Sequence, residues 1–92
     1  MFLRILFAAF LAITLTAVTP NHGKQGDVIK LSATGFPRIS RVMVGDNMCG
    51  TLKRTNDAIY CIVPPGTGTV DVSIVSNGVE PTVLKNAFTY DQ

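Results

Sequence analysis

The sequence predicts an all-β sandwich of about seven short strands that follows an apolar N-terminal segment. From about residue 15 onward, apolar and polar residues alternate in short runs, and glycine, proline or asparagine separates one run from the next. Alternation with a period of two is typical of half-buried strands, and no run keeps a helical period. The 92 residues suffice for one hydrophobic core but not for two. We therefore expect one domain over residues 15–92, preceded by an apolar segment over residues 1–14.

The glycine, proline and asparagine residues between the runs mark the ends of the expected strands. They cover residues 15–19, 28–34, 39–44, 49–53, 58–63, 69–76 and 87–90. In the second of them, Ile29, Leu31 and Ala33 share one face, and Phe36, which follows Gly35, is expected to plug the core.

Three further strands have a predicted inner face. Val42 and Val44 share one face of the strand over 39–44, and Arg41 and Met43 share the other face. The inward residues of strand 69–76 are Val70, Val72 and Ile74, with Asp71 and Ser73 outward, and those of the last strand are Phe88 and Tyr90. Asn77-Gly78 predicts a type I′ hairpin turn.

The N-terminal segment has two interpretations. It carries one early charge, Arg4, and then a long uncharged run, which is typical of a secretory signal with Ala17 or Ala12 as the cleavage position. The run is short for a membrane span, although membrane contact stays open. Alternatively, the segment is a retained docking arm that a partner buries, because an apolar arm is costly to expose to water. The expected contact residues of this arm are Phe2, Leu3, Ile5, Leu6, Phe7, Phe10 and Leu11.

The charge balance selects no partner. Eight basic and six acidic residues give a formal net charge of +2, too little to indicate nucleic acid. Four cations, Arg38, Arg41, Lys53 and Arg54, can share one edge, but aromatic residues are not interleaved with them. We therefore expect a solvated face there.

The two cysteines, Cys49 and Cys61, lie on neighbouring expected strands with a hairpin between them. Their side chains can meet across the ladder, so in an oxidising environment we expect a disulfide that closes a loop of about a dozen residues. In a reducing compartment the same residues would pack as two buried thiols.

The sequence offers no catalytic constellation. A cysteine nucleophile needs a base, and the only histidine, His22, falls in a polar turn remote in sequence from both cysteines. One histidine and two cysteines that prefer each other make no metal site. The carboxylates are dispersed without the spacing of a calcium loop or of an acid and base pair; they are Asp27, Asp46, Asp57, Asp71, Glu80 and Asp91. We expect no enzyme, no cofactor and no small-molecule substrate.

Several motifs together resemble one known family. Leu-Thr-Ala-Val-Thr-Pro over 15–20 is similar to its first strand and proline, and Gly35-Phe36 resembles the close of its second strand. Val-Met-Val-Gly over 42–45 with Cys49, followed by Ile-Tyr-Cys-Ile-Val-Pro-Pro-Gly over 59–66, resembles its cysteine pair and proline-rich turn. With the ending Phe-Thr-Tyr, the match covers about residues 15–90 and resembles the IPT/TIG family of immunoglobulin-like domains. The resemblance implies an immunoglobulin-like sandwich of E-set type.

The fold by itself does not select a function. Our first hypothesis is a non-catalytic structural or protein-interaction module on the surface of a larger assembly, such as a virion (capsid or tail) decoration protein, attached through its apolar arm. The alternative is a secreted or cell-envelope adhesion or carbohydrate-associated domain with a signal peptide or membrane anchor. Both hypotheses imply a protein partner or assembly subunits, and an extracellular, virion-surface or cell-envelope location.

Overall fold

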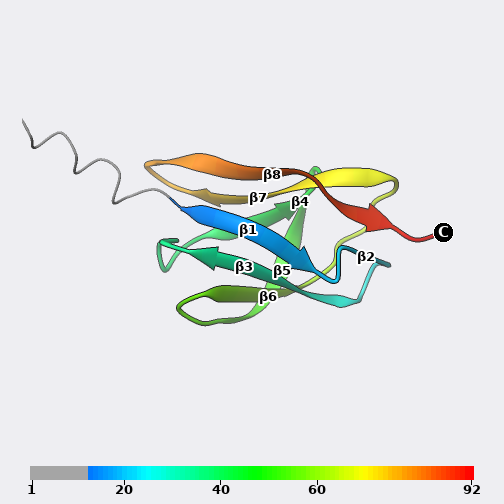
Figure 1. Cartoon of the computed structure of the whole chain (residues 1–92), viewed down its shortest axis with the longest axis horizontal. Helices are drawn as coiled ribbons and strands as arrows, with labels where there is room; N and C mark the ends of the chain where they lie inside the picture. The colour runs from blue at the N-terminus through cyan, green and yellow to red at the C-terminus, as the bar shows by residue number, and fades with distance from the viewer. Residues whose placement is uncertain (1–12) are drawn as a thin grey trace, which may run out of the picture.

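The structure is a computed structural model that describes residues 13–92, and this part of the chain forms strands without a helix (Figure 1). The strands are β1 (Thr14–Thr19), β2 (His22–Gly23), β3 (Val28–Thr34), β4 (Arg41–Val44), β5 (Asn47–Arg54), β6 (Ala58–Ile62), β7 (Thr69–Ser76) and β8 (Val79–Tyr90). The all-β prediction is confirmed. Residues 13–92 contain no helix long and apolar enough to cross a membrane.

The strands form two layers that share β5. The first layer contains β1, β3, β6 and the second half of β5, and the second layer contains the first half of β5 with β4, β7, β8 and β2. Within β5, Cys49 is paired with Val42 of β4, while the next residue, Gly50, is paired with Ile62 of β6. The chain therefore crosses from one layer to the other between Cys49 and Gly50, and the layers face each other as in a sandwich (Figure 1).

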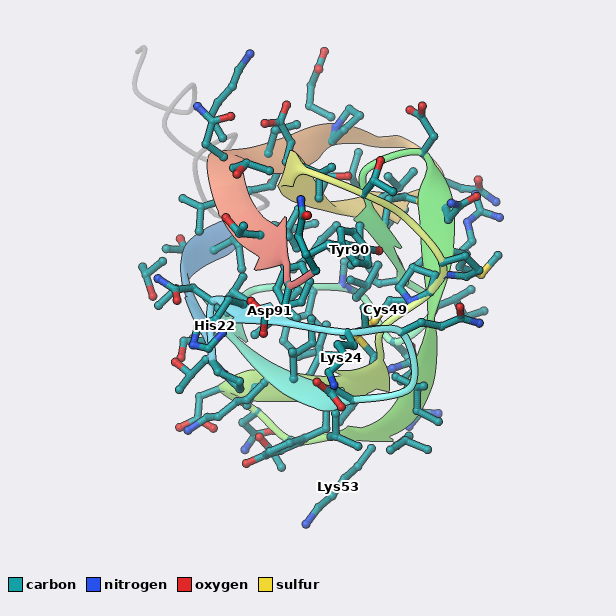
Figure 2. The ribbon with its side chains drawn as sticks, turned by 90° about the vertical axis from the view of Figure 1, so that its right-hand side faces the viewer. His22, Lys24, Cys49, Lys53, Tyr90 and Asp91 are labelled. Atoms are coloured by element: carbon teal, nitrogen blue, oxygen red, sulfur yellow. A yellow bond between two sulfur atoms is a disulfide. The ribbon has the colours of Figure 1, made fainter. Side chains whose placement is uncertain are left out.

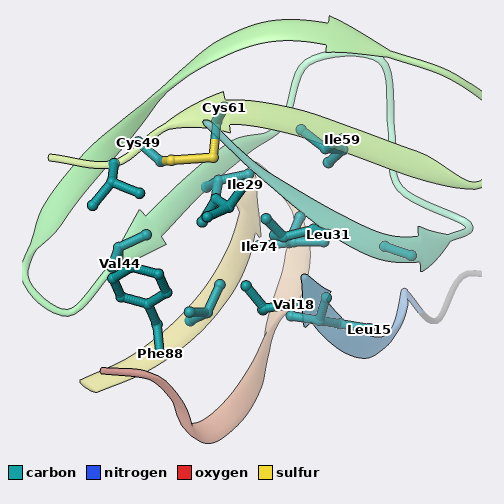
Figure 3. Packing of buried hydrophobic residues seen from close by; sticks show 14 of the residues in the cluster. Leu15, Val18, Ile29, Leu31, Val44, Cys49, Ile59, Cys61, Ile74 and Phe88 are labelled. Atoms are coloured by element: carbon teal, nitrogen blue, oxygen red, sulfur yellow. A yellow bond between two sulfur atoms is a disulfide. The ribbon is translucent and has the colours of Figure 1, made fainter. Parts of the chain in front are cut away.

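The core fills the space between the two layers (Figure 3). The residues predicted to face inward from β3 and β4 are all buried, as are Val72 and Ile74 of β7. The largest fully buried side chain is that of Phe88, whose ring meets the Tyr90 ring edge-on at 5.2 Å between centroids. Burial of such apolar surface is the main favourable contribution to folding. The core cluster comprises Ile13, Leu15, Val18, Ile29, Leu31, Ala33, Val42, Val44, Cys49, Ile59, Cys61, Val63, Val72, Ile74, Phe88 and Tyr90.

Cys49 and Cys61 form the predicted disulfide, with Cα atoms 5.7 Å apart. Both residues are buried, and the bond lies at the edge of the core near Ile29, which is paired with Cys61 (Figure 3). Because Cys49 is the last residue of β5 in the second layer, the bond ties the crossing strand to β6 of the first layer.

Two features near the C-terminus were not predicted. The short strand β2 runs parallel to the end of β8, where the Thr89 N–H donates to the Asn21 carbonyl and the Asp91 N–H to the Gly23 carbonyl. Such backbone pairing leaves no side-chain pattern in the sequence. The last strand also begins at Val79 instead of residue 87, and it accommodates Pro81 because β2 pairs with β8 only at Thr89 and Tyr90, far from Pro81.

Two local predictions are wrong. A type I′ turn needs positive φ at both central residues, but of Asn77 and Gly78 only Gly78 has one, at 77°. The third strand starts at Arg41 instead of residue 39, since the Ser40 hydroxyl turns inward to donate to the Pro37 carbonyl. As a result Ile39 is 81% exposed. Phe36 packs against the core only at its margin and is half-buried.

Tyr90 joins the C-terminal strand to the proline-rich turn. Its hydroxyl donates a hydrogen bond of 2.7 Å to the Pro64 carbonyl, and burial raises the pKa of Tyr90 above its ordinary value. A Cβ atom added to Gly66 would lie 2.6 Å from carbon atoms of the Tyr90 ring. The ring therefore requires a glycine at this position of the turn.

We predict that Gly66→Ala lowers the free energy of unfolding by about 1–3 kcal/mol, because the ring must move or the turn must distort. Gly50→Ala is the matched control, since a Cβ atom there meets nothing within 4 Å. It is expected to be neutral or to stabilise by up to about 1 kcal/mol. Urea unfolding followed by circular dichroism measures both values, and equal costs for the two variants would contradict the packing described.

We predict that the double variant Cys49→Ala/Cys61→Ala loses about 2–4 kcal/mol of stability, because the disulfide no longer restricts the unfolded chain. Urea unfolding with and without a reducing agent provides the measurement. Reduction should destabilise the natural sequence and leave the double variant unchanged. A natural sequence that is indifferent to reduction would refute a stabilising role of the bond.

Candidate functional site

In the part of the chain that the structure describes, residues 13–92, the reactive side chains are not gathered into one group. The two cysteine sulfurs are bonded to each other, so neither is a thiol nucleophile. The His22 side chain is exposed, and its Nδ1 lies 3.1 Å from Oδ2 of Asp91 (Figure 2). This contact connects β2 to the residue that follows β8. Within residues 13–92, no three His, Cys, Asp or Glu side chains come together in a way that would hold a metal ion.

The outer surface of the second layer carries a continuous row of side chains across four strands. Met48 of β5 is paired with Met43 of β4, Met43 with Ser73 of β7, and Ser73 with Val83 of β8. Met48 is 56% exposed and Val83 is 47% exposed, whereas Met43 and Ser73 are half-buried. Opposed residues on one face of a sheet are close neighbours, so Met48 and Met43 lie side by side, and Ser73 lies between them and Val83 in the same row.

This row continues toward one end of the sandwich. Arg41 and Val75 are paired in the neighbouring row, and both line a small hollow with Ile39. We call the residues Ile39, Met43, Met48, Val75 and Val83 the apolar face; Arg41 is the cation within it. A contiguous exposed apolar surface often marks a site of protein contact, and methionine side chains adapt easily to a partner.

The outer surface of the first layer is more polar. Its main hollow is lined by three threonines, Lys30, Ser32, Ala33 and Asp57. The ammonium of Lys53 lies 5.8 Å from the centre of the Tyr60 ring. Three large apolar side chains of this layer are exposed, those of Val28, Leu52 and Ile62. Val28 is paired with Ile62, and Ile62 is paired with Gly50 of β5, so the row ends at a residue without a side chain. The apolar face is therefore the larger candidate for contact.

The four cations predicted to share an edge are divided among three places. Arg41 lies within the apolar face, and Lys53 lies over Tyr60 on the first layer. Arg38 and Arg54 alone come together, at the end of the sandwich where the β3–β4 loop meets the β5–β6 hairpin (Figure 1). With Phe36, Thr55 and Asn56 they line an open cavity of about 470 Å³.

The predicted docking arm cannot be compared with this surface, because Phe2, Leu3, Ile5, Leu6, Phe7, Phe10 and Leu11 lie outside the described residues. The apolar face is not predicted by the sequence. Alternation identifies Met43 as outward, but Met48 and Val83 join it only through the pairing of strands that are distant in sequence.

Two facing layers, a strand that crosses between them and a core of alternating residues define an immunoglobulin-like sandwich. The sequence matches the family described as the IPT/TIG domain over residues 14–90. The chain belongs to the IPT/TIG family.

The similar proteins are much longer than this chain. Human Fibrocystin-L is 37% identical over 80 residues, which are 84% of this chain and 2% of that protein. The plexin A4 extracellular region has a similar fold, with a TM-score of 0.74 and 21% identity over 87% of this chain and 8% of that one. A candidate phosphatase from Bacteroides thetaiotaomicron is similar with a TM-score of 0.75 and 18% identity, over 86% of this chain and 18% of that one. The likeness to these two solved structures concerns the fold alone.

Proposed function

We propose that this domain is a non-catalytic protein-interaction module on the extracellular side of a cell-surface or secreted protein, and that its apolar face is the contact surface. The exposed row from Met48 to Val83 is the observation that carries the proposal. A surface of this kind gains free energy when a partner covers it, and a flat sheet face has no enclosed space in which to hold a substrate.

The extracellular location has two supports. The disulfide between Cys49 and Cys61 persists in oxidising compartments, which include the cell exterior. The similar plexin A4 structure is an extracellular region. Together with the 37% identity to human Fibrocystin-L, these observations favour the secreted or cell-envelope hypothesis over the virion decoration hypothesis.

The chemistry of the apolar face indicates the kind of partner. Its own charge is that of Arg41, whose exposed guanidinium lies beside Ile39 and Val75. A partner that presents apolar side chains to the two methionines and a carboxylate to Arg41 would match both features. We infer that this partner is a different protein or a neighbouring domain and not a second copy, because the apolar face carries no carboxylate that a second copy could offer to Arg41.

The proposal predicts where a partner can be cross-linked. A photoreactive phenylalanine analogue is placed at Met48 or Val83 of the full-length protein, and the protein is irradiated on the surface of the cells that produce it. The analogue should form an adduct with another protein. The matched control is the same analogue at Thr16, an exposed residue that lines the polar hollow of the first layer. Mass spectrometry of the adducts identifies the partner, and the yield at Thr16 should be much lower, because that residue lies on the opposite face of the sandwich.

Three results would contradict the proposal: equal yields on the two faces, adducts with lipid or glycan alone, or adducts only with a second copy of the chain. Stability is checked in parallel, since Met48→Glu and Val83→Glu change exposed positions and should alter the free energy of unfolding by no more than about 0.5 kcal/mol. The same two variants are expected to abolish capture of the cross-linked partner.

A further inference from the structure

The β3–β4 loop, residues 35–40, is fastened from both sides. On one side the buried Ser40 hydroxyl lies 2.7 Å from that of Ser76 at the end of β7, and it also donates to the Pro37 carbonyl at 2.6 Å. On the other side the Arg54 guanidinium donates a hydrogen bond to the Arg38 carbonyl. A loop held in this way loses little conformational entropy when it binds a ligand.

Among the residues that the structure describes, these contacts leave two guanidinium groups at one cavity without a carboxylate partner. Arg38 contributes its backbone carbonyl, its side chain makes no hydrogen bond to another described residue, and Arg54 retains further N–H donors. Within residues 13–92, neither arginine takes part in a salt bridge. Asp57, the carboxylate of the same hairpin tip, accepts the Thr55 hydroxyl and does not line the cavity.

The rest of the cavity suits a ligand that is apolar as well as anionic. Phe36 lines it, and this half-buried side chain packs against the margin of the core. Thr55 and Asn56 line it as well. Ile39, in the same loop, belongs to the apolar face, so the cavity lies directly beyond the end of the proposed contact surface.

We propose that this cavity binds an acidic peptide segment of the partner protein, with a carboxylate between Arg38 and Arg54 and an apolar side chain on Phe36. The planar fork of an arginine matches the two oxygens of a carboxylate. A peptide is favoured over an acidic glycan because the cavity lies next to the apolar face that we assign to a protein partner, and because Phe36 offers an apolar surface beside the two cations. This inference rests on the proposed function and names a second contact for the same partner.

The test is an NMR titration of the full 92-residue chain labelled with nitrogen-15. The probe is a synthetic acetylated peptide amide in which a central leucine has a glutamate on each side, and the control peptide has glutamine in place of both glutamates. We expect the glutamate peptide to shift the amide signals of residues 36–40 and 54–56, with an affinity that falls as salt is added. The glutamine peptide should leave them unchanged.

The variant Arg38→Gln should weaken binding of the glutamate peptide about tenfold, as expected when a charge-assisted hydrogen bond is lost. It removes the guanidinium and keeps the backbone carbonyl that Arg54 holds, so the loop stays clamped. Lys24→Gln, an exposed cation in the turn before β3, is the matched control and should bind as the natural sequence does.

Equal shifts with both peptides, shifts elsewhere on the surface, or unchanged affinity of Arg38→Gln would overturn the inference. So would tighter binding of inorganic phosphate or of a sulfated oligosaccharide at the same residues, since the site would then take a different class of anion. If these results occur while Met48 and Val83 still cross-link to a protein, the acidic-peptide site is refuted and the proposed function stands.

Discussion

The structure depends on the passage of β5 from one layer to the other. A sandwich whose layers are joined only by loops relies on core packing to hold them together, but here one strand supplies hydrogen-bonded partners to both. Cys49 pairs with β4, Gly50 pairs with β6, and the disulfide to Cys61 is made at the point of crossing. The bond restrains the part of the backbone on which both sheets depend, which matters in a domain of this size because its core is small.

The same crossing accounts for the position of both candidate contact sites. Before it, Met48 still lies in the second layer, where it extends the row that runs through Met43 to Val83. After it, the strand continues along β6 to Arg54, whose guanidinium reaches the carbonyl of Arg38. One strand thus contributes an apolar side chain to a sheet face and a cation to a loop. If a partner covers the apolar face as far as Ile39, the two arginines lie next to the edge of the covered surface.

The sequence predicts the features that local patterns encode. The strand over 28–34 is found with the expected bounds because its alternation is regular and a glycine and a proline follow it. The cysteine pair is also predictable, since a hairpin between two strands brings the side chains together. The inward positions of β4 and the last strand follow from the period of two.

The remaining features depend on pairings between distant segments. The two-residue strand β2 is made by backbone hydrogen bonds, and Asn77-Gly78 adopts a different turn because the pairing of β7 with β8 shifts in register next to it. The grouping of Arg38 with Arg54 follows from a hydrogen bond between a loop and a hairpin that no spacing in the sequence reveals, whereas the separation of Arg54 from Lys53 follows from alternation along β5. The apolar face likewise exists only once four strands are placed side by side.

The central claim is that the crossing strand and its disulfide make the two layers one cooperative unit, and native-state amide hydrogen exchange tests it most directly. The account predicts that amides of β4 and β6 exchange through the same global opening, and that Cys49→Ala/Cys61→Ala reduces the protection of both layers by a common factor. If the variant lost protection in β3 and β6 while β4 and β7 kept theirs, the layers would be independent, and the account would be wrong.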